Sequence, residues 1–254
     1  MQSEPAPRRV LLKLSGAVFA GRDGEPFGRD ALDWVASEVA EARRICPQMA
    51  IVVGGGNIMR GAHFCPEGHG RLLADYAGML ATAINALLLR HALECAGLAA
   101  AHYGAFPVPR MVPQFDPERA IADLRAGAVV VLAGGTGNPL LTTDTAAALR
   151  AGELGADLML KATRVDGVYS ADPETDPDAQ LFEELTYRQV LQKRLGVMDL
   201  TAVSLCMQQG LPVRVFNYSV AGNIRRAAAG EPVGTLIAGP FHEDSPGGNT
   251  DADP

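Results

Sequence analysis

The chain has 254 residues, and 48% of them are apolar, which is enough for a buried core in one α/β domain of generous size or in two small ones. A net charge of -7 and a pI of about 5.2 argue against a broad nucleic-acid-binding surface, so any anion site has to be local. The four cysteines are scattered without a CxxC pair, which indicates reduced thiols and a cytoplasmic protein. No apolar run approaches the length of a membrane-spanning helix, and no membrane partner is expected.

Strand-like and helical patterns alternate along the chain. They predict strands over 9–14, 49–53, 98–103, 128–133 and 157–162, with helices over 30–44, 73–96, 117–126 and 144–154 between them. Further helices are predicted over 186–195, 200–209 and 221–229, and further strands over 212–216 and 234–237. This order predicts a three-layer α-β-α sandwich with a mostly parallel central sheet, covered by helices on both faces.

Both ends of the chain differ from the part between them. Residues 1–7 and 240–254 are polar and rich in proline, glycine or acidic residues, which predicts a flexible N-terminus and a flexible acidic tail. The alternating pattern lies between them. A single domain is therefore expected over residues 8–239.

Small residues follow four of the predicted strands. They are Ser15-Gly16, the GGGN run at 54–57, the stretch GGTGNPLLTTDTAA at 134–147, and Ala162-Thr163. Ligands in parallel α/β sheets bind beyond the carboxyl ends of the strands, and such loops present backbone NH groups to anions. The four loops together predict a site for nucleotide phosphates. The chain contains neither GxxxxGK[ST] nor GxGxxG, which excludes a P-loop and a dinucleotide-binding fingerprint.

Lysine is rare in this chain: 22 residues are basic, and the lysines among them are Lys13, Lys161 and Lys193. Lys13 ends an apolar strand, where its ammonium could stabilise charge on a transferred phosphoryl group or could simply extend into solvent. Asp144 and Asp199 also allow two interpretations. Each could stabilise the start of a helix, or could orient a lysine or Mg²⁺ near the phosphates.

Six segments carry a specific resemblance. They read LLKLSG at 11–16, VVGGGNIMRG at 52–61, DYAGMLAT at 75–82, GTGNPLLTTDTAA at 135–147, LKATRVDGVYSADP at 160–173 and VMDL at 197–200. Through these segments and the order in which they occur, the chain resembles the bacterial uridylate kinases (UMP kinases) of the amino acid kinase superfamily. The resemblance extends over roughly residues 8–238. The resemblance implies an amino acid kinase-like fold and reversible transfer of the γ-phosphoryl group of ATP to UMP, giving UDP and ADP in pyrimidine nucleotide biosynthesis.

The resemblance also implies roles for individual residues. Catalysis would involve Lys13, Arg60, Asp144 and Asp199. ATP would contact Lys13, Leu14, Ser15, Gly16, Gly56, Arg60, Thr163, Tyr169 and Asp172. UMP would contact Gly55, Asp75, Thr136, Gly137, Asn138, Pro139, Leu140, Leu141, Thr142 and Thr143. UMP would thus lie mainly on the N-terminal half and ATP mainly on the C-terminal half. Mg²⁺ would be bound mainly through the ATP phosphates, so no direct protein ligand is predicted.

Members of the family are typically hexamers that GTP activates and UTP inhibits, so a homo-oligomer with these effectors is implied. The chain departs from the family at Ala17, where an acidic residue is usual, and at Leu140 and Leu141, where phenylalanine is common. Its loop at 21–28 is longer than in many relatives. The segment after Arg90 is poor in basic residues, which leaves the response to GTP open.

Three alternatives remain at this point. The protein could be a superfamily kinase for a small carboxylate or carbamate, although such a substrate would favour an arginine in the loop 134–143. It could also be a non-catalytic nucleotide- or oxyanion-binding protein that resembles molybdenum-storage subunits. Finally, the segment HFCPEGH at 63–69 contains soft metal ligands, but its spacing fits no standard zinc pattern.

Overall fold

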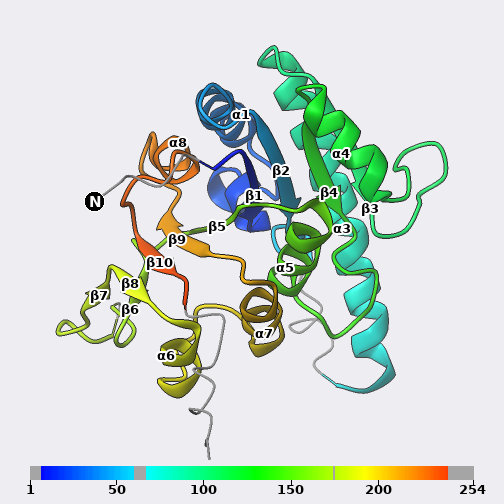
Figure 1. The fold of residues 1–254 in the computed structure, drawn as a ribbon. Helices are drawn as coiled ribbons and strands as arrows, with labels where there is room; N and C mark the ends of the chain where they lie inside the picture. The colour runs from blue at the N-terminus through cyan, green and yellow to red at the C-terminus, as the bar shows by residue number, and fades with distance from the viewer. Residues whose placement is uncertain (1–6, 60–66, 174, 240–254) are drawn as a thin grey trace, which may run out of the picture.

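The structure is a computed structural model that describes residues 7–59, 67–173 and 175–239. Its middle layer is an eight-stranded sheet (Figure 1). In their order across the sheet, the strands are β3 (Ala100–Gly104), β4 (Val129–Ala133), β2 (Gln48–Val53), β1 (Arg9–Leu14), β5 (Leu158–Thr163), β9 (Val213–Asn217), β10 (Thr235–Ile237) and β8 (Glu184–Leu185). Neighbouring strands run parallel from β3 through β9, whereas β10 pairs antiparallel with β9.

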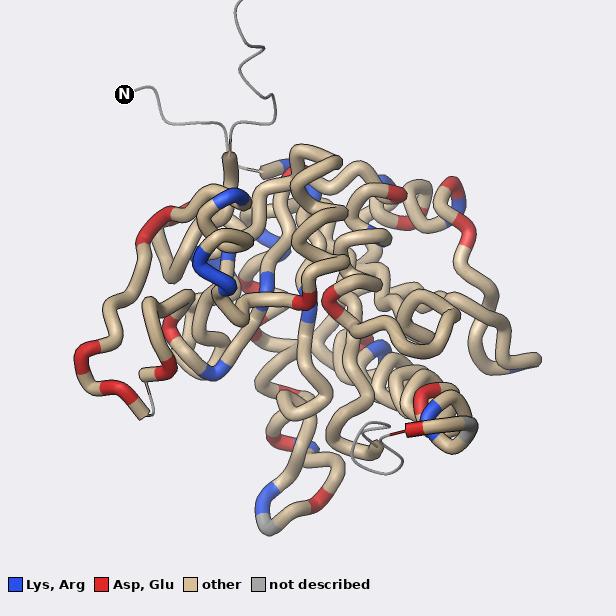
Figure 2. Tube along the Cα trace, turned by 90° about the horizontal axis from the view of Figure 1, so that it is seen from below, with Lys and Arg blue, Asp and Glu red and all other residues tan. Residues whose placement is uncertain are grey.

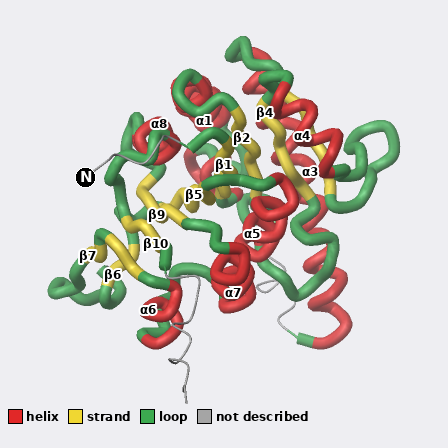
Figure 3. The backbone as a smooth tube through the Cα atoms, in the orientation of Figure 1, coloured by secondary structure: helices red, strands yellow, loops and turns green. Residues whose placement is uncertain are grey.

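Helices cover both faces of the sheet, as Figure 3 shows most simply. One layer contains α1 (Arg29–Arg43), α3 (Gly68–Cys95) and α8 (Asn223–Ala228). The other contains α4 (Pro117–Arg125), α5 (Thr143–Leu154), α6 (Tyr187–Gln192) and α7 (Leu200–Gln209). The predicted three-layer α-β-α sandwich is confirmed.

The central strands are apolar because both of their faces are buried. On β1, Val10, Leu12 and Leu14 pack into the core beneath α1, α3 and α8, while Leu11, between Val10 and Leu12, packs into the core on the opposite face. A parallel strand covered on both sides favours such an unbroken apolar run over an alternating one. Lys13 interrupts this apolar run near the end of β1, so its ammonium needs a specific partner.

The helices that follow β4 and precede β9 begin at polar caps. The Thr142 hydroxyl accepts hydrogen bonds from the backbone NH groups of Asp144 and Thr145, and α5 begins there. The Asp199 side chain accepts from the NH of Ala202 at the start of α7. Such caps satisfy NH groups that have no partner within the helix, so both residues are fixed in place before any ligand binds.

The structure differs from the predicted elements mainly in the C-terminal third. The short strands β6 (Val168–Tyr169) and β7 (Leu181–Phe182) form a separate hairpin that sequence patterning missed, because each has only two residues. Helix α6 ends at Gln192 rather than near 195, because Arg194 adopts a left-handed conformation with φ of 50°. Helix α3 begins at Gly68, earlier than expected.

One expectation about helix α3 was wrong. Its segment Gly70–Cys95 is long and apolar enough to cross a membrane, judged by length and composition alone. The helix instead packs against α1, β3 and β4, and Leu89 and Leu93 are fully buried in the core. Its apolar composition is therefore explained in part by its place in the sandwich.

Candidate active site

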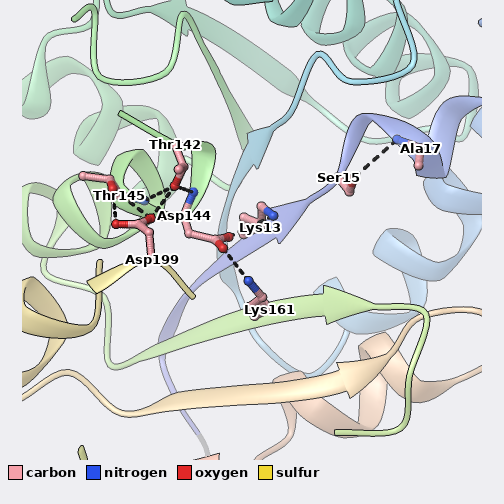
Figure 4. Close-up of polar contacts among 8 residues, drawn as sticks. All are labelled: Lys13, Ser15, Ala17, Thr142, Asp144, Thr145, Lys161 and Asp199. Atoms are coloured by element: carbon pink, nitrogen blue, oxygen red, sulfur yellow. Dashed lines mark hydrogen bonds and ion pairs between the residues drawn. The ribbon is translucent and has the colours of Figure 1, made fainter. Parts of the chain in front are cut away.

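Two lysines meet at the carboxyl edge of the sheet. Strands β1 and β5 are parallel neighbours, and Lys13 is the register partner of Lys161, so both side chains point to the same face. Asp144, in the first turn of α5, lies between them. Its Oδ1 is 2.8 Å from Lys13 Nζ, and its Oδ2 accepts a hydrogen bond from Lys161 Nζ (Figure 4).

The cluster is largely buried, with side chains of Lys13, Asp144 and Lys161 that are 13%, 13% and 10% exposed. Burial alone would raise the pKa of Asp144, but the two ammonium groups outweigh it and hold that pKa below its ordinary value. For Lys161, burial dominates and lowers the pKa, with Asp144 opposing. Two cations share one anion here, so the cluster retains positive charge where phosphates would bind.

Asp199 connects two helices rather than contacting the lysines. Besides capping α7, it accepts hydrogen bonds from the Thr145 hydroxyl at 2.9 and 3.0 Å and from the Thr142 hydroxyl (Figure 4). Its carboxylate thereby fixes the start of α5, the turn that carries Asp144. Sequence reasoning missed Thr145, although a hydroxyl one position after Asp144 on a helix facing α7 was a signal.

The loops after β1 and β2 lie against each other. Ser15 caps a short 3-10 helix, Gly16–Phe19, through a bond from the NH of Ala17 at 3.4 Å. A Cβ on Gly16 would lie 2.6 Å from the backbone nitrogen of Gly56, which explains why glycine is needed there. Leu14 is fully buried, so its side chain contributes to the core rather than to a ligand site. Arg60 and residues 63–66 of the histidine-containing segment lie outside the described residues.

A pocket of about 470 Å³ opens between these loops, α3 and the start of α5. Its lining residues are Gly55, Gly56, Met59, Arg71, Asp75, Gly78, Met79, Thr82, Gly135, Thr136, Leu141, Thr142 and Thr143. They include six of the ten residues predicted for UMP, as well as Gly56, which was predicted for ATP. Gly137, Asn138, Pro139 and Leu140 are not among them.

Sequence reasoning missed the helix side of this pocket. Arg71, Asp75, Gly78 and Thr82 recur at helical spacing and so form one face of α3. Projecting that face from Asp75 would have found the other three. Thr82 also connects the helix to the loop after β4, because its hydroxyl accepts from the NH of Gly134 at 2.6 Å.

A second pocket, of about 400 Å³, lies at the other side of the lysine pair. Its lining residues are Thr163, Val165, Gly167, Val168, Tyr169, Ser170, Ala171, Asp172, Pro173, Lys193, Arg194, Leu195, Gly196, Val197 and Val215. Thr163, Tyr169 and Asp172, predicted for ATP, thus share one pocket. The segment 193–197 was not predicted, because its position depends on where α6 ends.

Two cations also share one anion where Arg225 and Arg226 contact Glu231, but those three side chains are 36%, 40% and 38% exposed. Figure 2 shows basic and acidic positions interspersed along the trace.

Comparisons with known proteins bear on this site. The amino acid kinase family matches residues 8–217. A uridylate kinase of Legionella pneumophila (strain Paris) is 46% identical over 241 residues, covering 93% of this chain and 98% of that protein. The chain belongs to the amino acid kinase family. A uridylate kinase of Vibrio cholerae serotype O1 (strain ATCC 39541 / Classical Ogawa 395 / O395) is 47% identical over 235 residues, with coverage of 92% and 97%.

Solved structures of this family agree with the fold. A UMP kinase from Bacillus anthracis superposes with a TM-score of 0.88 at 36% identity, covering 92% of this chain and 97% of that one. A UMP kinase from Ureaplasma parvum has a TM-score of 0.85 at 31% identity, with coverage of 91% and 98%. The resemblance to uridylate kinases that the motifs indicated is confirmed.

Proposed function

We infer that this protein is a nucleoside monophosphate kinase that reversibly transfers the γ-phosphoryl group of ATP to UMP, giving UDP and ADP for pyrimidine nucleotide biosynthesis. The observation that carries this inference is the placement of two pockets on either side of Lys13 and Lys161. Strand order supports it, because β1 and β5 lie between β2 and β4 on one side and β9 on the other. Two nucleotides in these pockets would have their phosphates at the ammonium pair.

Phosphoryl transfer requires the protein to position the two substrates and to stabilise charge on the transferred group, and it requires no protein nucleophile. A phosphate oxygen of UMP is already anionic near neutral pH, so no general base is required. Lys13 would stabilise the charge on the group in transfer, and Lys161 would add to it. Asp144 would hold both ammonium groups in place, while Asp199 would fix the turn that carries Asp144.

Mg²⁺ fits this site as an ion carried by the ATP phosphates, where it would neutralise part of their charge. The donor set of the described residues agrees with this. Asp144 is already paired with Lys13 at 2.8 Å and with Lys161, so its carboxylate leaves the ion to the phosphates. Both oxygens of Asp199 are already bound by threonine hydroxyls.

For UMP we propose the pocket beside α3, where Gly55, Asp75 and the loop ending at Thr143 meet. Backbone NH groups and hydroxyls suit a uracil edge, a ribose and a phosphate, and fixed groups lose little entropy on binding. Arg60 would clamp a phosphate through its guanidinium. For ATP we propose the opposite pocket, with Thr163, Tyr169 and Asp172 at the adenosine end and the loop from Lys13 to Gly16 at the phosphates.

The test is ADP release in a coupled assay with ATP, Mg²⁺ and UMP, CMP, AMP or dTMP in parallel, with Lys13→Ala as the control. Turnover with UMP, abolished in the variant, is the expected result. Absence of turnover with every nucleotide, from protein that still binds ATP, would refute the inference and favour a small-acid kinase. Molybdenum bound to the purified protein would favour the storage alternative instead.

We also propose that the protein is a cytoplasmic homo-oligomer, a hexamer as the resemblance implies, with GTP as activator and UTP as inhibitor. Helix α3 supports the oligomer, because Leu73, Tyr76, Leu80 and Ile84 are exposed along one of its faces. Light scattering on the wild type and on Leu80→Glu tests the assembly, since a charge on this stripe should dissociate the particle. Assays with added GTP or UTP test the effectors.

A further inference from the structure

Arg71 links the pocket beside α3 to the loop that closes it. Its Nε donates to Asp75 Oδ1 at 2.9 Å, one helical turn along α3. Asp75 Oδ2 in turn accepts from the backbone NH of Leu140 at 2.9 Å, from a residue 65 positions away in the chain. The first of these hydrogen bonds lies within α3, and the second connects α3 to the loop 134–143.

Leu140 needs such a restraint. Its φ is 67°, in the left-handed region that a residue with a Cβ disfavours by about tenfold or more. It follows Pro139, and the residue after proline in a turn with positive φ is usually glycine. Its side chain is 62% exposed, so packing contributes little to holding it. The hydrogen bond that its backbone NH donates to Asp75 Oδ2 favours this conformation.

Arg71 holds the carboxylate of Asp75 through one of its two oxygens. With one oxygen fixed by the guanidinium, the carboxylate directs its other oxygen at Leu140. The pair is partly buried, with side chains 29% and 14% exposed, so solvent screens it less than a surface pair. The Arg29–Asp33 pair on α1 has the same helical spacing but is 94% and 60% exposed, and its atoms are 3.8 Å apart. The Arg71–Asp75 pair is therefore shorter and better shielded from solvent than the Arg29–Asp33 pair.

We propose that Arg71 is a positioning residue for UMP, acting through Asp75 to hold the loop 134–143 in the shape that forms the pocket wall. The residues directly after Leu140 are Leu141, Thr142 and Thr143, and all three line the pocket. A change in the backbone conformation of Leu140 would therefore displace these three residues. This inference rests on the proposed function and adds to it a residue that no motif indicated.

The first test compares Arg71→Met with Arg29→Met as its matched control. Steady-state kinetics should show the KM for UMP raised about tenfold in R71M, because a loop freed at Leu140 populates the binding shape about one-tenth of the time. kcat and the KM for ATP should stay within about twofold of the wild type. R29M should match the wild type throughout, and Arg71→Lys, which keeps the charge, should recover part of the loss.

The second test separates positioning from direct contact with UMP. Glycine adopts a positive φ readily, so Leu140→Gly in the R71M background should lower the KM for UMP by about threefold. Arg110→Gly, at another exposed residue with φ of 69°, is the matched control and should give no recovery. If L140G gives none either, Arg71 acts on the ligand directly and the positioning role is refuted.

Two further outcomes distinguish this inference from the proposed function. An R71M protein with an unchanged KM for UMP, or with both KM values raised alike, would overturn the inference while UMP kinase activity stood. A wild-type protein without UMP turnover would overturn both. Thermal unfolding of each variant, expected within a few degrees of the wild type, shows that the changes are local.

Discussion

Lys13 lies directly across from Lys161 in the register of β1 and β5, and Asp144 contacts both ammonium groups. The spacing of the two cations is therefore set by backbone hydrogen bonds between strands rather than by loops. One carboxylate does not cancel two ammonium groups, so positive charge is available to phosphates.

Lys13→Met should reduce kcat by about 10²- to 10³-fold, the range found when a preorganised charge-stabilising group is removed. The KM for UMP should change less than kcat, because Lys13 does not line the pocket beside α3 and would meet UMP only at its phosphate. The coupled ADP assay measures both. A variant with kcat within threefold of the wild type would show that Lys161 alone suffices.

Asp144→Asn should destabilise the protein by about 3 kcal/mol at pH 7, because two buried ammonium groups then lack a counter-charge. In the folded wild type, the pKa of Asp144 lies below its ordinary value of 3.8, because the charges of Lys13 and Lys161 outweigh the effect of burial. The stability that the carboxylate contributes is therefore complete above that value and is lost as the pH falls through the folded pKa. Urea unfolding should show a constant gap between wild type and variant down to about pH 4, and a narrowing gap below it. A gap that does not depend on pH would mean that Asp144 is not ionised in this cluster.

Thr145→Val should cost about 1–3 kcal/mol of unfolding free energy, because it removes a hydroxyl donor from the carboxylate of Asp199. Thr145 is only 3% exposed, so water cannot easily replace that donor. Thr145→Ser keeps the hydroxyl and should lose clearly less. Thermal and urea unfolding of the two variants give the comparison, and equal losses would point to packing of the methyl group instead.

Gly16→Ala should cost about 1–3 kcal/mol and raise the KM for ATP, because the new Cβ forces the loops after β1 and β2 apart. That atom would lie 2.5 Å from the Asn57 side-chain oxygen and 2.6 Å from the Gly56 nitrogen, and the backbone cannot simply rotate away. Gly196→Ala is the control for stability, since a Cβ there meets nothing within 4 Å. Equal stability of the two variants would show that the loops can separate freely.

The fold could be predicted where the chain has long, regular elements. The strand that ends at Lys13 and the helix that begins near Asp144 were found because apolar runs and small-residue loops alternate clearly. The two-residue strands β6 and β7 could not be found, since so short a run has no period. The antiparallel pairing of β10 with β9 also could not be predicted, because it depends on contacts between residues distant in sequence.

The candidate site was predicted in part for a similar reason. Lys13 and Asp144 stood out through their place at strand and helix ends, and the structure brings them together. The partnership of Lys161 with Asp144 could not be read from the sequence, because it depends on the register of β1 and β5. Arg71 could have been found by projecting the helix face from Asp75, but its indirect link to Leu140 through Asp75 depends on tertiary structure.

The strand register of Lys13 and Lys161 also has a consequence for the motions of the empty protein. Backbone amides in strands buried on both faces exchange with solvent only when much of the molecule opens, whereas exposed loops exchange through small local openings. The ammonium pair should therefore stay assembled while the loop 134–143 fluctuates. On gradual heating, UMP affinity should weaken before the charge cluster comes apart, and amide exchange should be slowest at β1 and β5.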